Sequence, residues 1–209
     1  MKTFLKTVAA LALLSAGAPA LAASADEAVA LEVAAASLAP NKFVWSGAAE
    51  AMSDEPVTVV VSLPLQRAFV FRGRAMIAAS AVSTGADDKP TPTGVFPILQ
   101  KAEKHRSNLY GSSMPYMQRL TWDGVALHAG ANPGFPASHG CVRLPAAFAK
   151  RLFEVTDKGS VVVITDQAFV DSTLDPELLR TDAARANDAQ LAALTASADG
   201  EAAAPEAGN

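Results

Sequence analysis

Residues 137–144 read ASHGCVRL and combine residue types that could carry out nucleophilic chemistry. Cys141 is the only cysteine of the chain, so it cannot form an intramolecular disulfide. A thiol becomes an effective nucleophile when a base or a nearby cation favours its thiolate form. The alternative is structural, because a free cysteine often fills a core as a small apolar residue.

A nucleophilic cysteine needs a base, and the chain offers three histidines. His128 ends a predicted strand, VALHAG, in which alternation places it on the face opposite Leu127, so we expect it to face a cleft. His139 lies two residues from Cys141, on the same side of an extended segment. His105 belongs to the polar run KAEKHRSN, which is typical of a solvated surface.

The neighbours of Cys141 suit the same chemistry. Gly140 allows the backbone to approach a ligand closely, as an oxyanion hole of successive N–H groups requires. A helix predicted to begin near Pro145 would favour the thiolate at its N-terminus. Arg143 offers a fixed positive charge for a substrate carboxylate.

A metal site is the competing chemical interpretation of these residues. His128, His139 and Cys141 could act as ligands, as imidazole and thiolate do for zinc. No carboxylate or second cysteine stands at a typical ligand spacing from them. We therefore expect neither a bound metal nor a cofactor.

The N-terminus has the pattern of an export signal. Lys2 and Lys6 precede a short apolar run over 8–16, and Ala20-Leu21-Ala22 is a small-x-small cleavage site. The apolar run is shorter than the roughly 20 residues that span a bilayer. We predict a signal peptide over 1–22 and a mature chain without a membrane span; a retained signal anchor is the alternative.

Charge divides the rest of the chain into three parts. Residues 57–165 carry 12 Lys or Arg and 6 Asp or Glu, a net charge of +6, whereas 23–56 and 166–209 carry −5 and −7. A basic domain suits an acidic polymer as partner, although a solvated surface without special meaning fits the same balance. Export argues against nucleic acid as that partner.

Composition predicts one domain with two tails. Residues 57–166 form the predicted domain, and the Ala-rich stretch 23–56 is predicted to be a flexible lead-in with a short helix over 27–37. The acidic, Ala-rich tail 167–209 has few large apolar residues and is predicted to be largely disordered. A helix over 176–194, capped by Asp175, is compatible with its sequence.

The domain itself is predicted to be mainly β. Apolar, β-branched runs predict strands over 57–63, 67–72 and 75–85 as a meander, and a buried strand over 160–165. Asp123-Gly124 suits a type I′ turn between two alternating runs. The segment 145–159 is predicted to be a helix, because Phe148, Leu152 and Val155 follow helical spacing. We expect this helix to pack against a sheet.

Three segments resemble the YkuD-type L,D-transpeptidase family. HAGANPGFPASHGCVRL (128–144) is similar to the family signature, STGADDKPTPTGVFPI (83–98) to a segment that precedes it, and MPYMQRLTWDGVALHAG (114–130) to its central hairpin. The resemblance covers roughly 57–165 and implies a β-sandwich-like fold with one packed helix. The interval from His128 to Ser138 is shorter here than in many members.

The resemblance also implies roles for individual residues. Cys141 would be the nucleophile and His128 the general base, with the backbone carbonyl of Ala129 fixing the imidazole tautomer. The implied oxyanion and pocket residues are Ser138, His139, Gly140 and Ala129, and the implied substrate-binding residues are Arg143 and Tyr116, the latter lining the cleft.

By the same resemblance, the protein would be a cell-wall enzyme, and the predicted export signal would place it in the periplasm. It would cleave the bond between diaminopimelate and D-Ala in a peptidoglycan stem and transfer the acyl group to an amine. The acceptor could be a second stem, an outer-membrane protein, or water, which would make the enzyme a carboxypeptidase or endopeptidase. A non-catalytic wall-binding module is the remaining alternative.

Overall fold

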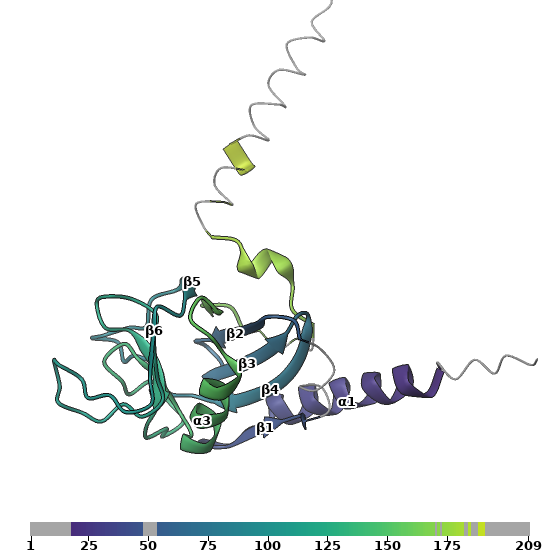
Figure 1. The fold of residues 1–209 in the computed structure, drawn as a ribbon, viewed down its shortest axis with the longest axis horizontal. Helices are drawn as coiled ribbons and strands as arrows, with labels where there is room; N and C mark the ends of the chain where they lie inside the picture. The colour runs from purple at the N-terminus through teal and green to yellow at the C-terminus, as the bar shows by residue number, and fades with distance from the viewer. Residues whose placement is uncertain are drawn as a thin grey trace, which may run out of the picture.

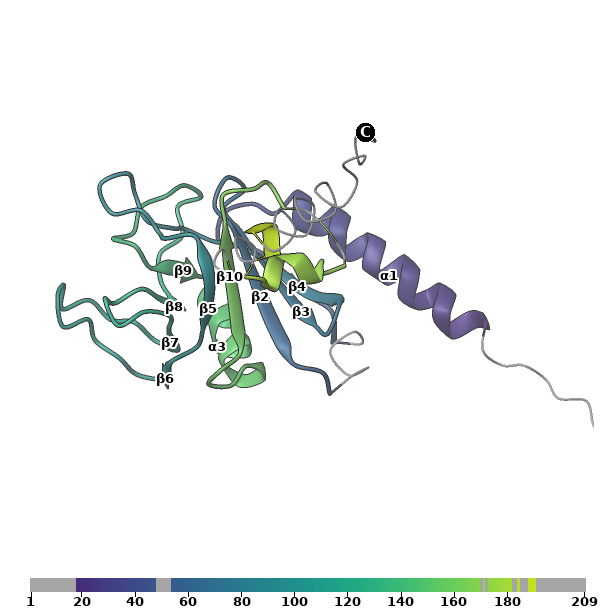
Figure 2. The ribbon, with the colours of Figure 1, turned by 90° about the horizontal axis from the view of Figure 1, so that it is seen from above.

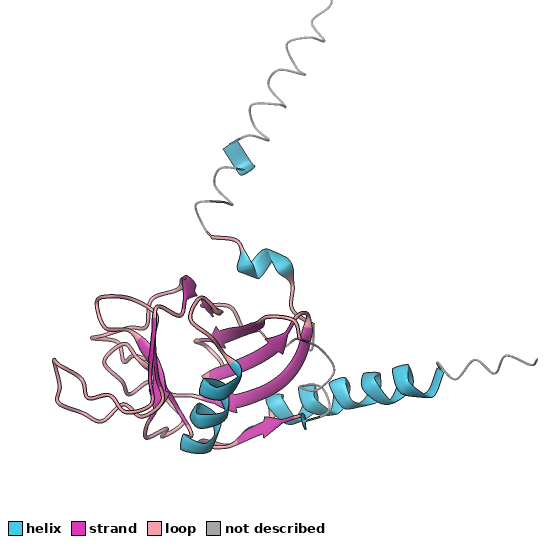
Figure 3. Ribbon diagram, in the orientation of Figure 1, coloured by secondary structure: helices cyan, strands magenta, loops and turns pink. Residues whose placement is uncertain are grey.

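The computed structural model describes residues 18–47, 54–169, 171, 173–181, 184 and 188–190. Within these residues two β-sheets lie on either side of one helix, α3 (Figures 1 and 3). The strands of the first sheet are, in order across it, β1 (Phe43–Trp45), β4 (Ala75–Ala81), β3 (Arg67–Arg72), β2 (Val57–Ser62), β10 (Val161–Thr165) and β5 (Gly94–Pro97). Those of the second sheet are β6 (Gln100–Ala102), β7 (Met117–Arg119), β8 (Ala126–Ala129) and β9 (Val142–Leu144). The helical elements are α1 (Ala18–Ala36), α3 (Ala146–Val155) and the 3₁₀ helix η1 (Pro176–Leu179).

The first sheet contains the predicted meander. Strands β2, β3 and β4 pair antiparallel in sequence order, although β4 ends at Ala81 rather than at Gly85. Strand β10 returns to lie parallel to β2, with Val162 opposite Val59. All six residues of β2 are buried: Val57, Val59 and Val61 face the main core, and the other face, with Val60 between Thr58 and Ser62, is also covered. The prediction of a mainly β, YkuD-like fold with one packed helix is confirmed.

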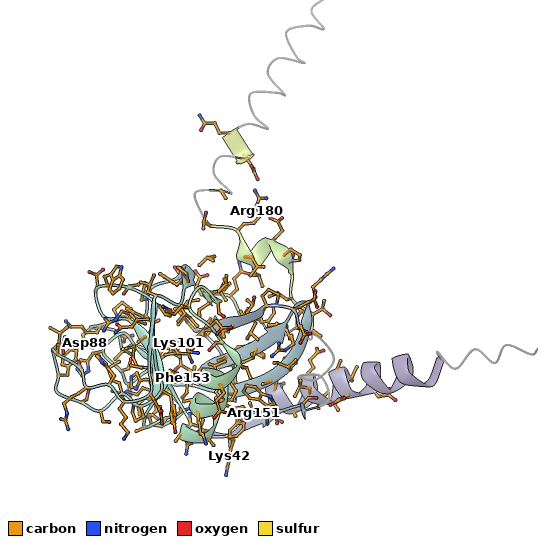
Figure 4. The ribbon with its side chains drawn as sticks, viewed as in Figure 1. Lys42, Asp88, Lys101, Arg151, Phe153 and Arg180 are labelled. Carbon is orange, nitrogen blue, oxygen red and sulfur yellow. The ribbon has the colours of Figure 1, made fainter. Side chains whose placement is uncertain are left out.

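The main core contains residues of both sheets and of α3, the helix that lies between the strands of the two sheets in Figure 2. Phe148 and Leu152 of α3 are fully buried there with residues of β2, β3, β8 and β9. The C-terminal end of α3 is held by Lys101 of β6, whose Nζ donates to Phe153 O at 2.6 Å and lies 4.4 Å from the Phe153 ring centroid (Figure 4). The helix that follows the cysteine segment is thus fixed to both sheets.

The hairpin of β7 and β8 forms where the sequence predicts it, but with a different turn. The N–H of Gly124 donates to Thr121 O, so the turn spans 121–124. Gly124 has a φ of 109°, whereas Asp123 is not among the residues with positive φ. A type I′ turn needs positive φ at both central residues, so the predicted turn type is wrong.

The lead-in, 23–56, contains a helix where one is predicted over 27–37, but this helix, α1, packs on the domain where flexibility is predicted. Leu31, Ala35 and Leu38 are buried on the outer face of the first sheet, at helical spacing. The buried face that these residues form is narrow and rich in alanine, so the sequence shows only a weak helical periodicity of large apolar residues. Arg67 holds the end of α1, since its guanidinium donates to the carbonyls of Ala35 and Leu38.

Strand β1 adds a second anchor for the lead-in. It pairs antiparallel with β4, and the rings of Phe43 and Trp45 lie 5.5 and 5.4 Å from that of Phe148. The guanidinium of Arg151 stacks over Trp45 at 4.5 Å. The lead-in therefore covers α3, and the folded unit begins well before residue 57.

The acidic tail also differs from its prediction at its beginning. Phe169 and Leu174 are buried against the same outer face of the first sheet as α1. The Asp175 side chain caps η1 by accepting from the Glu177 N–H at 2.9 Å. Residues 191–209 and four short gaps before them lie outside the described part of the tail.

Replacing Phe169 by alanine is expected to lower the free energy of unfolding by about 3 kcal/mol, because a large buried aromatic leaves a cavity. Its ring makes edge contacts with Phe69 and Phe71, at 5.4 and 5.9 Å between centroids. Phe135→Ala is the matched control, since that ring is 59% exposed. Urea unfolding measures both, and equal effects would contradict a structural role for this part of the tail.

The predicted signal peptide is only partly described. Residues 1–17 lie outside the described residues, and α1 begins at Ala18, before the predicted cleavage site at Ala22. None of the helices described here is long and apolar enough to cross a membrane.

Candidate functional site

His128 is presented by β8 at the edge of a cavity. Leu127 and Ala129 point into the main core, so the alternation of the strand turns Ala126 and His128 to the opposite face. His128 is 6% exposed and lines a cavity of about 840 Å³. The predicted placement of this imidazole in a cleft agrees with the structure.

The tautomer of His128 is fixed by its neighbour. Nδ1 lies 2.8 Å from the backbone oxygen of Ala129, and a carbonyl can only accept, so Nδ1 carries the proton. The resemblance implied this same contact. Nε2 of the neutral ring is then left as the acceptor, which is the state that a general base needs.

Cys141 reaches the same cavity from the next strand. It lies directly before β9, which is parallel to β8 with Val142 opposite Leu127 and Arg143 opposite His128. This register places Cys141 beside Ala126, diagonally across from His128 on the same face of the sheet. Its thiol is partly exposed and donates to Gly124 O at 3.4 Å.

Burial favours the neutral forms of both groups. It raises the pKa of Cys141, against the hydrogen bond from the Ala126 backbone and the charges of Arg143 and Arg119, which lower it. Burial also lowers the pKa of His128; the Ala129 hydrogen bond opposes this, and Arg143 and His105 add to it. At neutral pH the resting pair is a thiol beside a neutral imidazole.

This corrects the expectation of a thiolate held by a helix N-terminus. The three extended residues of β9 separate Cys141 from α3, which begins at Ala146, and span about 10 Å. The field of a helix terminus falls off within its first turn. The thiol therefore ionises only when a base removes its proton.

The segment before the thiol is a tight turn closed by Ser138. Its Oγ donates to Cys141 O at 2.5 Å and accepts from the Gly140 N–H at 3.2 Å. Gly140 has a φ of 105°, which explains the need for glycine here. Its N–H is turned toward Ser138, so its predicted part in an oxyanion hole is not supported.

His139 lines the cavity and is held by an aromatic residue from a distant loop. The ring of Tyr110 stacks on it with 4.6 Å between centroids and 25° between planes. Tyr110 belongs to a loop that closes on itself, because its N–H donates to Ser107 Oγ at 3.2 Å and Ser107 N–H donates to Ser112 O at 2.9 Å. Nothing in the sequence pairs these two rings.

Among the charged side chains of the cavity wall, basic ones outnumber acidic ones. Lys89, Arg119 and Arg143 line it, against one carboxylate, Asp123. The stem of Arg143 lies so close to Gly130 that a Cβ there would come within 3.1 Å of its Cγ. Part of the positive charge of the domain is thus concentrated around the thiol, where an acidic ligand would experience it.

Tyr116 was predicted to line the cleft, and the structure places it elsewhere. Its backbone has a φ of 55°, and its ring packs against Phe153 of α3 at 5.9 Å and against the main core. Met117, the next residue, is the one that lines the cavity. The side chain therefore faces the opposite side of the strand from the thiol.

Sequence reasoning did not place several polar residues of the cavity there, among them His105, which was expected on the solvated surface. Tyr110, Arg119, Lys89 and His105 carry no local pattern, although Arg119 lies on the strand paired with that of His128. In the described residues, no group of three or more His, Cys, Asp and Glu side chains could hold a metal ion.

Comparisons with known proteins agree with this arrangement. A model of the YkuD L,D-transpeptidase catalytic domain matches residues 56–164. An L,D-transpeptidase from Stackebrandtia nassauensis has a similar structure, with 29% identity and a TM-score of 0.50 over 54% of this chain and 57% of its own. The LD transpeptidase LdtMt1, in complex with imipenem, is 22% identical with a TM-score of 0.51 over 53% of this chain and 59% of its own, and it shows similarity of fold.

The chain thus spans less than two thirds of the length of these structures. A comparison with curated proteins gave no match. The family match nevertheless covers more than half of the 209 residues. The chain therefore belongs to the L,D-transpeptidase catalytic-domain family, YkuD.

Proposed function

We propose that this protein is a periplasmic L,D-transpeptidase that acts on peptidoglycan stem peptides through Cys141. The observation that carries the proposal is the pairing of β8 with β9. It brings a thiol and an imidazole with a free Nε2 to one face of the sheet, where both line a basic cavity. Stem peptides carry free carboxylates, which Arg143, Arg119 and Lys89 would attract.

The reaction would proceed through a thioester. His128 Nε2 takes the thiol proton as the sulfur attacks the carbonyl carbon of the diaminopimelate–D-Ala bond. The tetrahedral intermediate collapses, the C–N bond breaks, and the imidazolium gives its proton to the departing D-Ala amine. An amine of a second stem then attacks the thioester, His128 takes the proton of that amine, and the sulfur leaves and regains a proton.

The test is product analysis with a defined substrate. The purified chain is incubated with a disaccharide-tetrapeptide, and the products are identified by mass spectrometry. Cross-linked dimers with released D-Ala are expected. Tripeptides alone would mean that water is the acceptor and that the enzyme is a carboxypeptidase.

One cysteine makes the control specific. Alkylation with iodoacetamide modifies Cys141 alone and should remove all product, whereas chelation should not. Imipenem should add its mass covalently to Cys141, as a relative of the same fold has been solved with this compound. A parent chain that binds wall fragments without changing them would support a binding module instead.

A further inference from the structure

The segment 83–91 clasps the turn that carries Cys141. Ser83 exchanges both backbone hydrogen bonds with Arg143, at 3.0 and 2.9 Å, and Thr84 O accepts from the Ala137 and Ser138 N–H groups, both at 3.0 Å. The resemblance assigns no chemical role to this segment, although it lies directly beside the turn that carries the proposed nucleophile.

Two contacts from this segment fall on carbonyls of the turn. Ala86 N–H donates to Ser138 O at 3.0 Å, and the Thr91 hydroxyl donates to Gly140 O at 2.9 Å. A trans peptide unit is planar, with its C=O and N–H pointing in opposite directions. Holding these two carbonyls therefore also fixes the directions of the next N–H groups, those of His139 and Cys141.

The N–H of Gly140 between them is already used. It donates to Ser138 Oγ at 3.2 Å, so it faces into the turn. By contrast, the His139 and Cys141 N–H groups have no hydrogen-bond partner in the part of the chain that the structure describes. Both residues line the cavity, and two free N–H groups beside the nucleophile are what an oxyanion hole requires.

Thr91 is the one side chain in this clasp that bonds directly to the peptide unit of the nucleophile. It is 4% exposed, and its Oγ1 accepts from the Gly85 N–H at 2.8 Å while it donates to Gly140 O. A hydroxyl has a single proton, so the bond from Gly85 leaves the donor role for Gly140 O. The loop closes this tightly because Gly85 lacks a Cβ, which would lie 2.1 Å from Lys89 O.

We propose that Thr91 is a positioning residue for acyl transfer, which holds the Gly140–Cys141 peptide so that the Cys141 and His139 N–H groups form the oxyanion hole. The proposal rests on the proposed function and deepens it, because it assigns donors to the intermediate and a side chain that orients one of them. Thr91 itself does not touch the substrate.

The test compares two reactions of the same sulfur. Acylation by imipenem passes through an oxyanion, whereas alkylation by iodoacetamide does not. Thr91→Val removes the hydroxyl at nearly equal volume, and we expect it to slow acylation on the order of 10- to 100-fold, less than the 10²–10³ seen when a donor is lost completely. Its alkylation rate should remain that of the parent.

Three further chains complete the design. Thr91→Ser keeps the hydroxyl and should restore acylation, and Thr58→Val in β2 makes the same change at another buried threonine, 7% exposed, away from the turn. If Thr91→Val shows no cooperative thermal unfolding, and is therefore not folded, Thr91→Ala replaces it with the same expected rates.

Parent-like acylation in Thr91→Val would overturn the proposal. So would an equal loss of acylation and alkylation, because the effect would then lie in access to the thiol. A parent chain that imipenem does not acylate, although iodoacetamide alkylates it, would overturn the proposed function and this proposal with it.

Discussion

Replacing Cys141 by alanine is expected to reduce the formation of both dimers and tripeptides to the uncatalysed background. Loss of the proposed nucleophile would remove the thioester path entirely, and in enzymes whose residues act as a unit such losses reach about 10⁶-fold. The side chain is small and partly exposed, so the free energy of unfolding should change by about 1 kcal/mol or less. Product mass spectrometry and urea unfolding measure the two effects.

Cys141→Ser provides the sharper comparison. Serine keeps the size and the donor, but its hydroxyl is a much weaker nucleophile than a thiol at neutral pH. A cysteine that only fills space beside Met114, Met117 and Ala126 would tolerate this change. We expect the serine chain to fold and to be inactive; substantial turnover in either variant would exclude Cys141 as the nucleophile.

The second large effect concerns the base. His128→Gln is expected to slow acylation by imipenem by about 10²–10⁴-fold at pH 7, the usual contribution of a positioned general base. Because burial lowers the pKa of His128 below its ordinary value of 6.5, the parent rate should fall only at pH below 6.5, as the ring becomes protonated. This acid limb should disappear in the variant.

His105→Gln is the matched control for the base. His105 lines the same cavity, and its charge contributes to the lowered pKa of His128. Its removal should leave acylation active at pH 7 and move the acid limb toward higher pH, since one cause of the lowering is gone. Stopped-flow measurement of acylation between pH 5 and 8 follows both chains. An acid limb that survives in His128→Gln would assign the base to another group.

Several features of this protein followed from the sequence alone. Strands β2 and β3, helix α3 and strand β10 were predicted close to their observed bounds, because each depends on a local pattern of apolar residues. The face of His128 followed from alternation within one strand. The combination of a lone cysteine with nearby His, Gly and Arg was sufficient to select the candidate site.

The tertiary structure decided how these parts meet. Tyr116 faces away from the cavity because Met117 and Arg119 of β7 line it, and one residue of offset reverses the face of a side chain. The lead-in and the start of the tail order because the outer face of the first sheet buries Leu31 and Phe169. Local sequence contains neither effect, since each depends on residues far away in the chain.

The chemistry of the site divides in the same way. Residue types determined that a thiol and an imidazole are available, whereas only the packing of β8 against β9 and their burial decided that the resting pair is neutral. Likewise, only the folded chain brings Thr91 to the carbonyl of Gly140, 49 positions away. Protonation and orientation depend on the surroundings of a group, and folding alone creates those surroundings.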